Sequence, residues 1–196
     1  MKRVTVTTLV ALLVFGPAVA LAHPGHDGET GLVHGFFHPI TGIDHILAMV
    51  AVGLLAAQYG GRALWLIPAT FLAAMAIAGT LGMAGIQVPI AEVGIGLSVV
   101  VFGLAVAFQF KPPTLVVMAV VGFFALFHGY VHGAEVPDEQ AGLSFAAGFL
   151  AATALLHGVG VGLGLLLQRR TLSRRLIQAG GGAMALVGIA VLANIL

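Results

Sequence analysis

The residues of this sequence that could do chemistry are histidines and carboxylates, and the first group is His38, Asp44 and His45. A carboxylate beside a histidine can orient the imidazole, share its proton, or join it in binding a cation. His38 and His45 share one face of a helix, but they would lie about 10 Å apart along a straight one. Either Gly42 and Pro39 distort the helix so that both histidines reach one ion, or the two form successive stations of a path. The alternative without a role in transport is a hydrogen-bonded Asp–His pair that only holds two helices together.

A second group lies more than eighty residues further along the chain. His128 and His132 are four residues apart, the spacing that lets two imidazoles on one helical face bind one metal ion, and Glu135 continues that face. An interfacial position without function is the alternative for His132. Glu92 is expected at a similar depth in a neighbouring helix. His157 is either an inner station of the same path or a packed core histidine.

The composition says where these groups must lie. Of the 196 residues, 60% are hydrophobic and 8% charged, against roughly 25% charged in soluble domains. A net charge of +1 leaves no basic surface for nucleic acid, and the absence of cysteine excludes thiolate metal sites and cysteine nucleophiles. We therefore expect an all-α, polytopic membrane protein whose rare polar residues mark its function.

The N-terminus has the form of a secretory signal. Two basic residues precede an apolar stretch, and small residues end it at Ala22, so residues 1–22 are predicted to be a cleaved signal peptide, with an uncleaved first helix as the alternative. Residues 23–37 then form an extracytoplasmic, histidine-rich segment. Residues 38–196 are expected to form one domain of six transmembrane helices, with no room for a soluble domain and no phosphate-binding loop for ATP.

Six apolar windows in that domain are long enough to cross about 30 Å of hydrocarbon. Pro39 is expected in the first turn of the first window, with His38 at the helix cap. Glycines at 158–164 and 180–182 predict close helix packing. The windows are 39–58, 63–83, 89–109, 114–133, 142–167 and 176–195.

The basic residues predict the orientation. Arg62, Lys111 and the four arginines within 169–175 fall in the first, third and fifth loops, which a cleaved signal would leave in the cytoplasm. The mature N-terminus and the C-terminus are then extracytoplasmic. Imidazole and carboxylate ligands without thiolate favour Ni²⁺, Co²⁺, Zn²⁺ or Cu²⁺ over Cu(I), Mg²⁺ or Ca²⁺, and they leave the preferred metal open.

The motifs His-x5-Asp-His and Phe-His-Gly-x3-Gly-x-Glu resemble those of the HupE/UreJ family of nickel permeases, and the likeness covers essentially the whole mature chain. It implies uptake of Ni²⁺, or of Co²⁺ as in some relatives, across the bacterial inner membrane. His132 occupies an unspecified position of the second motif, so its role rests on spacing alone. The residues that the resemblance assigns to transport are His38, Asp44, His45, His128 and Glu135.

We therefore expect a permease driven by the membrane potential, with the metal ion as substrate, the lipid bilayer around it, no ATPase subunit and no resident cofactor. It is not expected to be an enzyme. The first alternative is a proton-coupled carrier of Co²⁺, Zn²⁺ or Cu²⁺, in which Asp44 and His45 shuttle protons. An intramembrane metalloenzyme is the weaker alternative, because the sequence has no His-Glu-x-x-His motif. The oligomeric state is left open.

Overall fold

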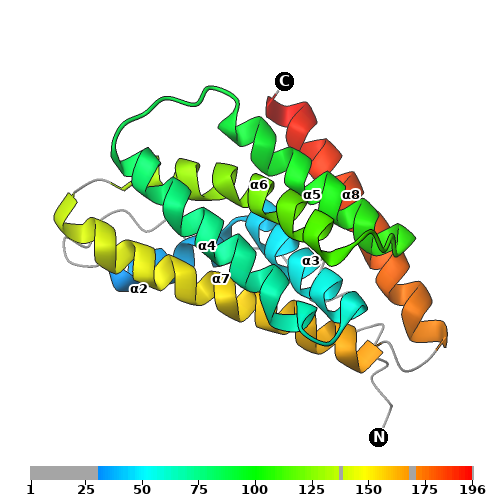
Figure 1. Ribbon diagram of the computed structural model, residues 1–196. Helices are drawn as coiled ribbons and strands as arrows, with labels where there is room; N and C mark the ends of the chain where they lie inside the picture. Colours follow the sequence, from blue (N-terminus) through cyan, green and yellow to red (C-terminus); the bar gives the residue numbers. More distant parts are fainter. Residues whose placement is uncertain (1–30, 137–138, 168–170, 196) are drawn as a thin grey trace, which may run out of the picture.

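The computed structural model describes residues 31–136, 139–167 and 171–195, and every element in these ranges is a helix. Figure 1 shows the long helices side by side in one bundle. The predicted signal peptide, most of segment 23–37, and Arg169 and Arg170 lie outside the described residues. In chain order the helices are α2 (Leu32–Thr41), α3 (Ile43–Tyr59), α4 (Ala63–Met83), α5 (Ala91–Phe108), α6 (Thr114–Ala134), α7 (Glu139–Leu167) and α8 (Thr171–Ile195).

The predicted class is confirmed, because five of these helices are long and apolar enough to cross a membrane. They are α4, α5, α6, α7 and α8, and their bounds follow the predicted windows closely. The bounds of α4 match the predicted window 63–83, and those of α6 extend the window 114–133 by one residue. The chain is a multi-pass membrane protein.

The first span differs from its prediction. Instead of one helix over 39–58, α2 and α3 meet at an angle of 85°, and they make a sixth span only if the bent pair is counted as one. Gly42 causes the break, since its extended backbone (φ −88°, ψ 120°) ends α2 and glycine is a poor helix former. The Thr41 hydroxyl donates to the carbonyl of His38 (2.8 Å) and satisfies a group at the helix end. The placement of Pro39 in a first turn and of His38 at a cap is wrong, because both lie in the last turn of α2.

Glycine contacts hold the helices close together. At Gly133 of α6 and Gly53 of α3, an added Cβ would collide with backbone of α4 and α7 respectively. Such contacts let helices approach where lipid supplies no hydrophobic drive between them. The predicted packing role holds for Gly160, Gly164 and Gly181. It is wrong for four glycines at which an added Cβ would have no atom of the described residues within 4 Å, namely Gly158, Gly162, Gly180 and Gly182.

The two ends of the bundle differ in charge. Helices α3, α5 and α7 begin at one end of the bundle, and α4 and α6 terminate there. We call it the histidine end, because His45 and His132 lie there. Basic residues described by the structure lie at the opposite, arginine end: Arg62 before α4, Lys111 before α6, and two arginines in the first turns of α8. Arg174 of α8 donates to Gln109, just after α5, over 2.5 Å. The charge separation therefore agrees with the pattern in the sequence.

Candidate metal site

The first half of the site lies at the start of α3, directly after the bend. The ring Nδ1 of His45 lies 2.7 Å from Asp44 Oδ1, which also accepts the backbone N–H of His45 over 2.9 Å. An ionised carboxylate only accepts hydrogen bonds, so Nδ1 carries the ring proton and Nε2 carries the lone pair. Asp44 thereby fixes His45 in the tautomer that can bind a cation through Nε2.

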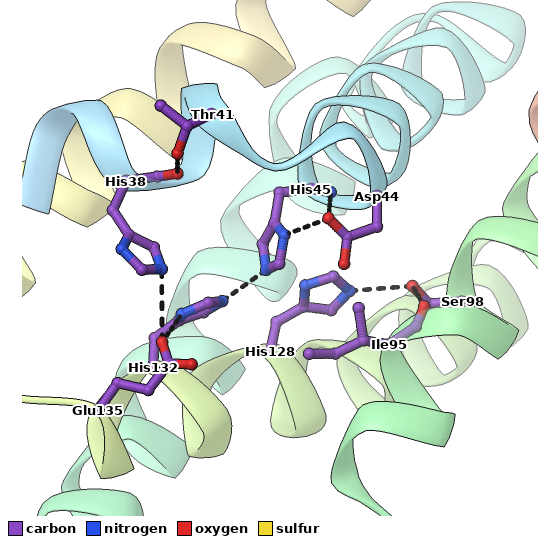
Figure 2. Close-up of polar contacts among 9 residues, drawn as sticks. All are labelled: His38, Thr41, Asp44, His45, Ile95, Ser98, His128, His132 and Glu135. Atoms are coloured by element: carbon purple, nitrogen blue, oxygen red, sulfur yellow. Dashed lines mark hydrogen bonds and ion pairs between the residues drawn. The ribbon is translucent and has the colours of Figure 1, made fainter. Parts of the chain in front are cut away.

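The second half of the site comes from the end of α6 and repeats this arrangement. His132 Nδ1 donates to Glu135 Oε2 over 3.0 Å, so its Nε2 is also left with a lone pair. The two Nε2 atoms of His45 and His132 face each other 2.5 Å apart (Figure 2). Two lone pairs repel, and this pair of imidazoles is stable only with a proton or a metal ion between them.

The bend at Gly42 also brings His38 to the site. Its ring centroid lies 4.8 Å from that of His132, while the rings of His45 and His132 are 4.5 Å apart. His38 Nε2 lies 3.4 Å from Glu135 Oε2. The chain is therefore distorted at Gly42, as one of the alternatives required, and the distortion places the rings of both His38 and His45 beside that of His132. Ligand atoms of His38, His132 and Glu135 all lie within 4.8 Å of one another and could hold one metal ion.

The carboxylate of Glu135 lies just beyond the end of α6 and is about half exposed. Hydrogen bonds from His132 and then His38 hold its pKa well below the usual value for glutamic acid, although partial burial acts in the opposite direction. The group is therefore ionised at neutral pH. It supplies a negative charge at the mouth of the site, where a cation would arrive.

These side chains surround a cavity of about 360 Å³ at the histidine end. Glu92 reaches it from the first turn of α5, as its predicted depth required. A water molecule takes up about 30 Å³ in the liquid, so the cavity has room for an ion with part of its hydration shell. The predicted site residues that line it are His38, Asp44, His45, Glu92, His132 and Glu135.

His128 is placed differently from its prediction. It does not line the cavity, and the three-ligand group pairs His132 with His38 and Glu135 instead. Its Nε2 lies 2.9 Å from Ser98 Oγ, whose hydroxyl donates to a backbone carbonyl of α5, so His128 donates through Nε2. The Nδ1 atom keeps a lone pair and has no partner among the residues that the structure describes. The His128 ring nevertheless contacts that of His45, with centroids 5.2 Å apart.

His157 lies further from the cavity, in the half of α7 nearer the arginine end. It is buried, and its ring contacts that of Phe71 with centroids 5.1 Å apart.

Sequence reasoning missed Ser98 and the phenylalanines around the histidines, of which Phe149 has its ring centroid 4.5 Å from that of His132. Ser98 could have been found from the sequence, because a hydroxyl side chain is conspicuous in an apolar helix. The phenylalanines give no such signal, because apolar residues are common in every span.

Comparisons with known proteins identify the family of the chain. The family model described as "HupE / UreJ protein" matches residues 9–191. The chain belongs to the HupE/UreJ family. Protein HupE of Rhizobium leguminosarum bv. viciae is 46% identical over 192 residues, which cover 98% of this chain and 99% of that protein. No solved structure matches the chain.

Membership confirms the resemblance that the two motifs predicted. HupE/UreJ proteins are transporters, and the family is associated with the uptake of nickel and cobalt. In this member, four residues of the two motifs line one cavity at the histidine end, namely His38, Asp44, His45 and Glu135. Neutral imidazoles and ionised carboxylates can bind a divalent transition-metal ion reversibly there, as transport requires.

Proposed function

We propose that this HupE/UreJ protein carries Ni²⁺, with Co²⁺ as the next choice, across the bacterial inner membrane into the cytoplasm. The observation that carries the proposal is the pair of facing Nε2 atoms of His45 and His132. Histidines that bind metals usually donate their other ring N–H to a carboxylate, which fixes the ring and strengthens the ligand. Asp44 and Glu135 provide that carboxylate for each histidine in turn.

The separation of the two nitrogens fits a site that opens slightly to admit an ion. Two imidazole nitrogens that bind one metal at about 2.0–2.1 Å lie about 3 Å apart. The observed 2.5 Å between His45 and His132 thus requires an opening of about half an ångström. The His38 ring, 4.8 Å from that of His132 between centroids, is close enough to add a further ligand. Nitrogen and carboxylate oxygen ligands, in a chain without cysteine, suit Ni²⁺ and Co²⁺ better than Cu(I).

The charge separation gives the direction of transport. Positive residues favour the cytoplasmic side of a membrane, which places the arginine end in the cytoplasm and the histidine end outside. The ends of the mature chain are then both extracytoplasmic, after cleavage of residues 1–22. Carboxylates at the outer end, Glu92 and Glu135 among them, raise the local concentration of cations before they bind.

The membrane potential supplies the driving force in this proposal. Each elementary charge gains about 2.3 kcal/mol per 100 mV, so a divalent cation gains about 4.6 kcal/mol, or roughly three decades of concentration. Neither ATP hydrolysis nor an ATPase subunit is then required. The protein acts as a permease and not as an enzyme, with the metal ion as substrate and no resident cofactor.

The test is uptake of radioactive Ni²⁺ into vesicles that contain the purified full chain. We expect an inside-negative potential, imposed by a K⁺ gradient with valinomycin, to drive uptake without ATP and in the presence of a proton uncoupler. Co²⁺ should compete better than Zn²⁺ or Cu²⁺. Uptake that requires a proton gradient would establish the proton-coupled alternative, and no uptake under any gradient would refute transport.

A pair of variants tests the site itself. His45→Ala and His132→Ala should each lower uptake at limiting Ni²⁺ by at least tenfold, and the double variant should be little worse than either, because two ligands of one ion act as a unit. Thr80→Ala is the control, since its hydroxyl only donates to a carbonyl of its own helix at the same end of the bundle. Additive losses from the two histidines would mean that they do not bind the same ion.

A further inference from the structure

Helix α7 carries buried polar side chains that the proposed outer site does not use. His157 is 2% exposed, and Thr153, one turn earlier, is 0% exposed. Their spacing of four residues places both on one face of the helix. Within the described part of the chain, neither ring nitrogen of His157 nor the hydroxyl of Thr153 has a hydrogen-bond partner.

Three polar atoms without partners in one region need an explanation. Buried polar groups in proteins are almost always hydrogen-bonded, because removal from water without a partner costs free energy. A histidine kept only for packing would be expected to donate to a carbonyl or a hydroxyl, as His128 does with Ser98. An apolar residue would fill the space beside Phe71 at lower cost. The polar atoms of His157 and Thr153 are therefore best explained by a ligand that binds and leaves.

A series of ring contacts connects this region to the outer site. The His45 ring contacts that of His128 at 5.2 Å between centroids, the His128 ring contacts Phe71 at 5.4 Å, and Phe71 contacts His157 at 5.1 Å. Phe71 lies near the middle of α4. Along this series, His157 is the first polar side chain beyond Phe71 in the direction of the arginine end.

We infer that His157 and Thr153 form a second, inner station that binds the transported divalent cation after it leaves the outer cavity. This inference rests on the proposed function. The inner ligands are neutral nitrogen and oxygen atoms, whereas the outer site includes the carboxylates of Asp44 and Glu135. Binding at the inner station is therefore weaker, as a path requires if an ion is to enter at one end and leave at the other.

The test counts Ni²⁺ ions on the purified full chain by equilibrium dialysis with radioactive Ni²⁺. We expect the wild type to bind two ions, one tightly and one weakly. His157→Leu should keep the tight ion, lose the weak one, and lower uptake into vesicles by at least tenfold. Its yield should not fall, because leucine removes two unpartnered polar atoms from the interior. A wild type that binds one ion, or unchanged uptake by His157→Leu, would overturn the inner station.

A smaller change guards against a folding defect in that variant. Thr153→Val removes only the hydroxyl and should weaken the second ion at least threefold. Thr70→Val is the matched control, because the Thr70 hydroxyl donates to the carbonyl of Leu66 in its own helix over 2.8 Å. Equal effects of the two threonine variants would refute a role for Thr153 as a ligand.

The outcomes separate this inference from the proposed function. A wild type that neither binds nor transports Ni²⁺ overturns both. A wild type that transports Ni²⁺ while His157→Leu transports it equally well overturns the inner station alone, and the outer site stands.

Discussion

The substitution Gly133→Ala tests whether helix contact distance sets the geometry of the metal site. Gly133 of α6 packs against α4, where an added Cβ would lie 2.8 Å from the Cα of Gly79 and closer still to its carbonyl oxygen. Ordinary van der Waals contact begins near 3.4 Å, so α4 and α6 must move apart by about 1 Å or distort. Overpacking of this kind costs about 1–3 kcal/mol.

The displacement reaches the site because Gly133 directly follows His132. A shift of the helix end by about 1 Å is several times the tolerance of about 0.2 Å on metal–ligand distances. His132 would then no longer face His45, and it could no longer share an ion with His38. We expect Gly133→Ala to lower the thermal unfolding temperature of the purified protein and to reduce uptake of radioactive Ni²⁺ at limiting metal by at least tenfold.

The control is Gly180→Ala on α8, where an added Cβ would meet no atom within 4 Å in the part of the chain that the structure describes. That variant should unfold and transport like the wild type. Wild-type stability and uptake in Gly133→Ala would show that the α4–α6 contact does not position His132, and the reasoning would fail.

Three further predictions concern single contacts. Ser98→Ala removes the partner of His128 Nε2 and should cost about 1–3 kcal/mol; an unfolding midpoint equal to that of the wild type in detergent would contradict this. Asp44→Asn keeps an acceptor oxygen for His45 but loses the negative charge. The variant protein should insert into the membrane normally and lose at least nine-tenths of Ni²⁺ uptake. Normal uptake would show that the charge of Asp44 has no role in transport. Alanine can adopt the backbone conformation of Gly42, but the new Cβ of Gly42→Ala would lie 2.8 Å from His45 Nδ1 and 2.9 Å from Asp44 Oδ1. We therefore expect normal protein levels and at least fivefold weaker Ni²⁺ binding, measured by dialysis. Unchanged binding would show that the Asp–His pair tolerates displacement.

The sequence alone determined the class of the protein and the bounds of most helices. Hydropathy and length are properties of a short stretch of chain, so α4, α6 and α7 could be located before any contact was known. The motif histidines and carboxylates could be chosen for the same reason, because polar groups in apolar helices are conspicuous. Their spacing also predicted that Glu135 continues the helical face of His132, since residues three apart are neighbours on one helix, and the structure joins the two by a hydrogen bond.

Only the tertiary structure decided which of these groups meet. The 85° bend at Gly42 brings His38 beside His132, and Ser98 turns His128 away from the three-ligand group. Neither follows from spacing, because these contacts join different helices. In a soluble protein an apolar stripe shows which face of a helix packs inward. In a membrane, lipid and neighbouring helices are equally apolar, so the sequence does not distinguish the faces that pack from those that meet lipid. For the same reason the sequence does not distinguish Gly158 from Gly160, although Gly160 packs against the backbone of α3 and an added Cβ at Gly158 meets no described atom within 4 Å.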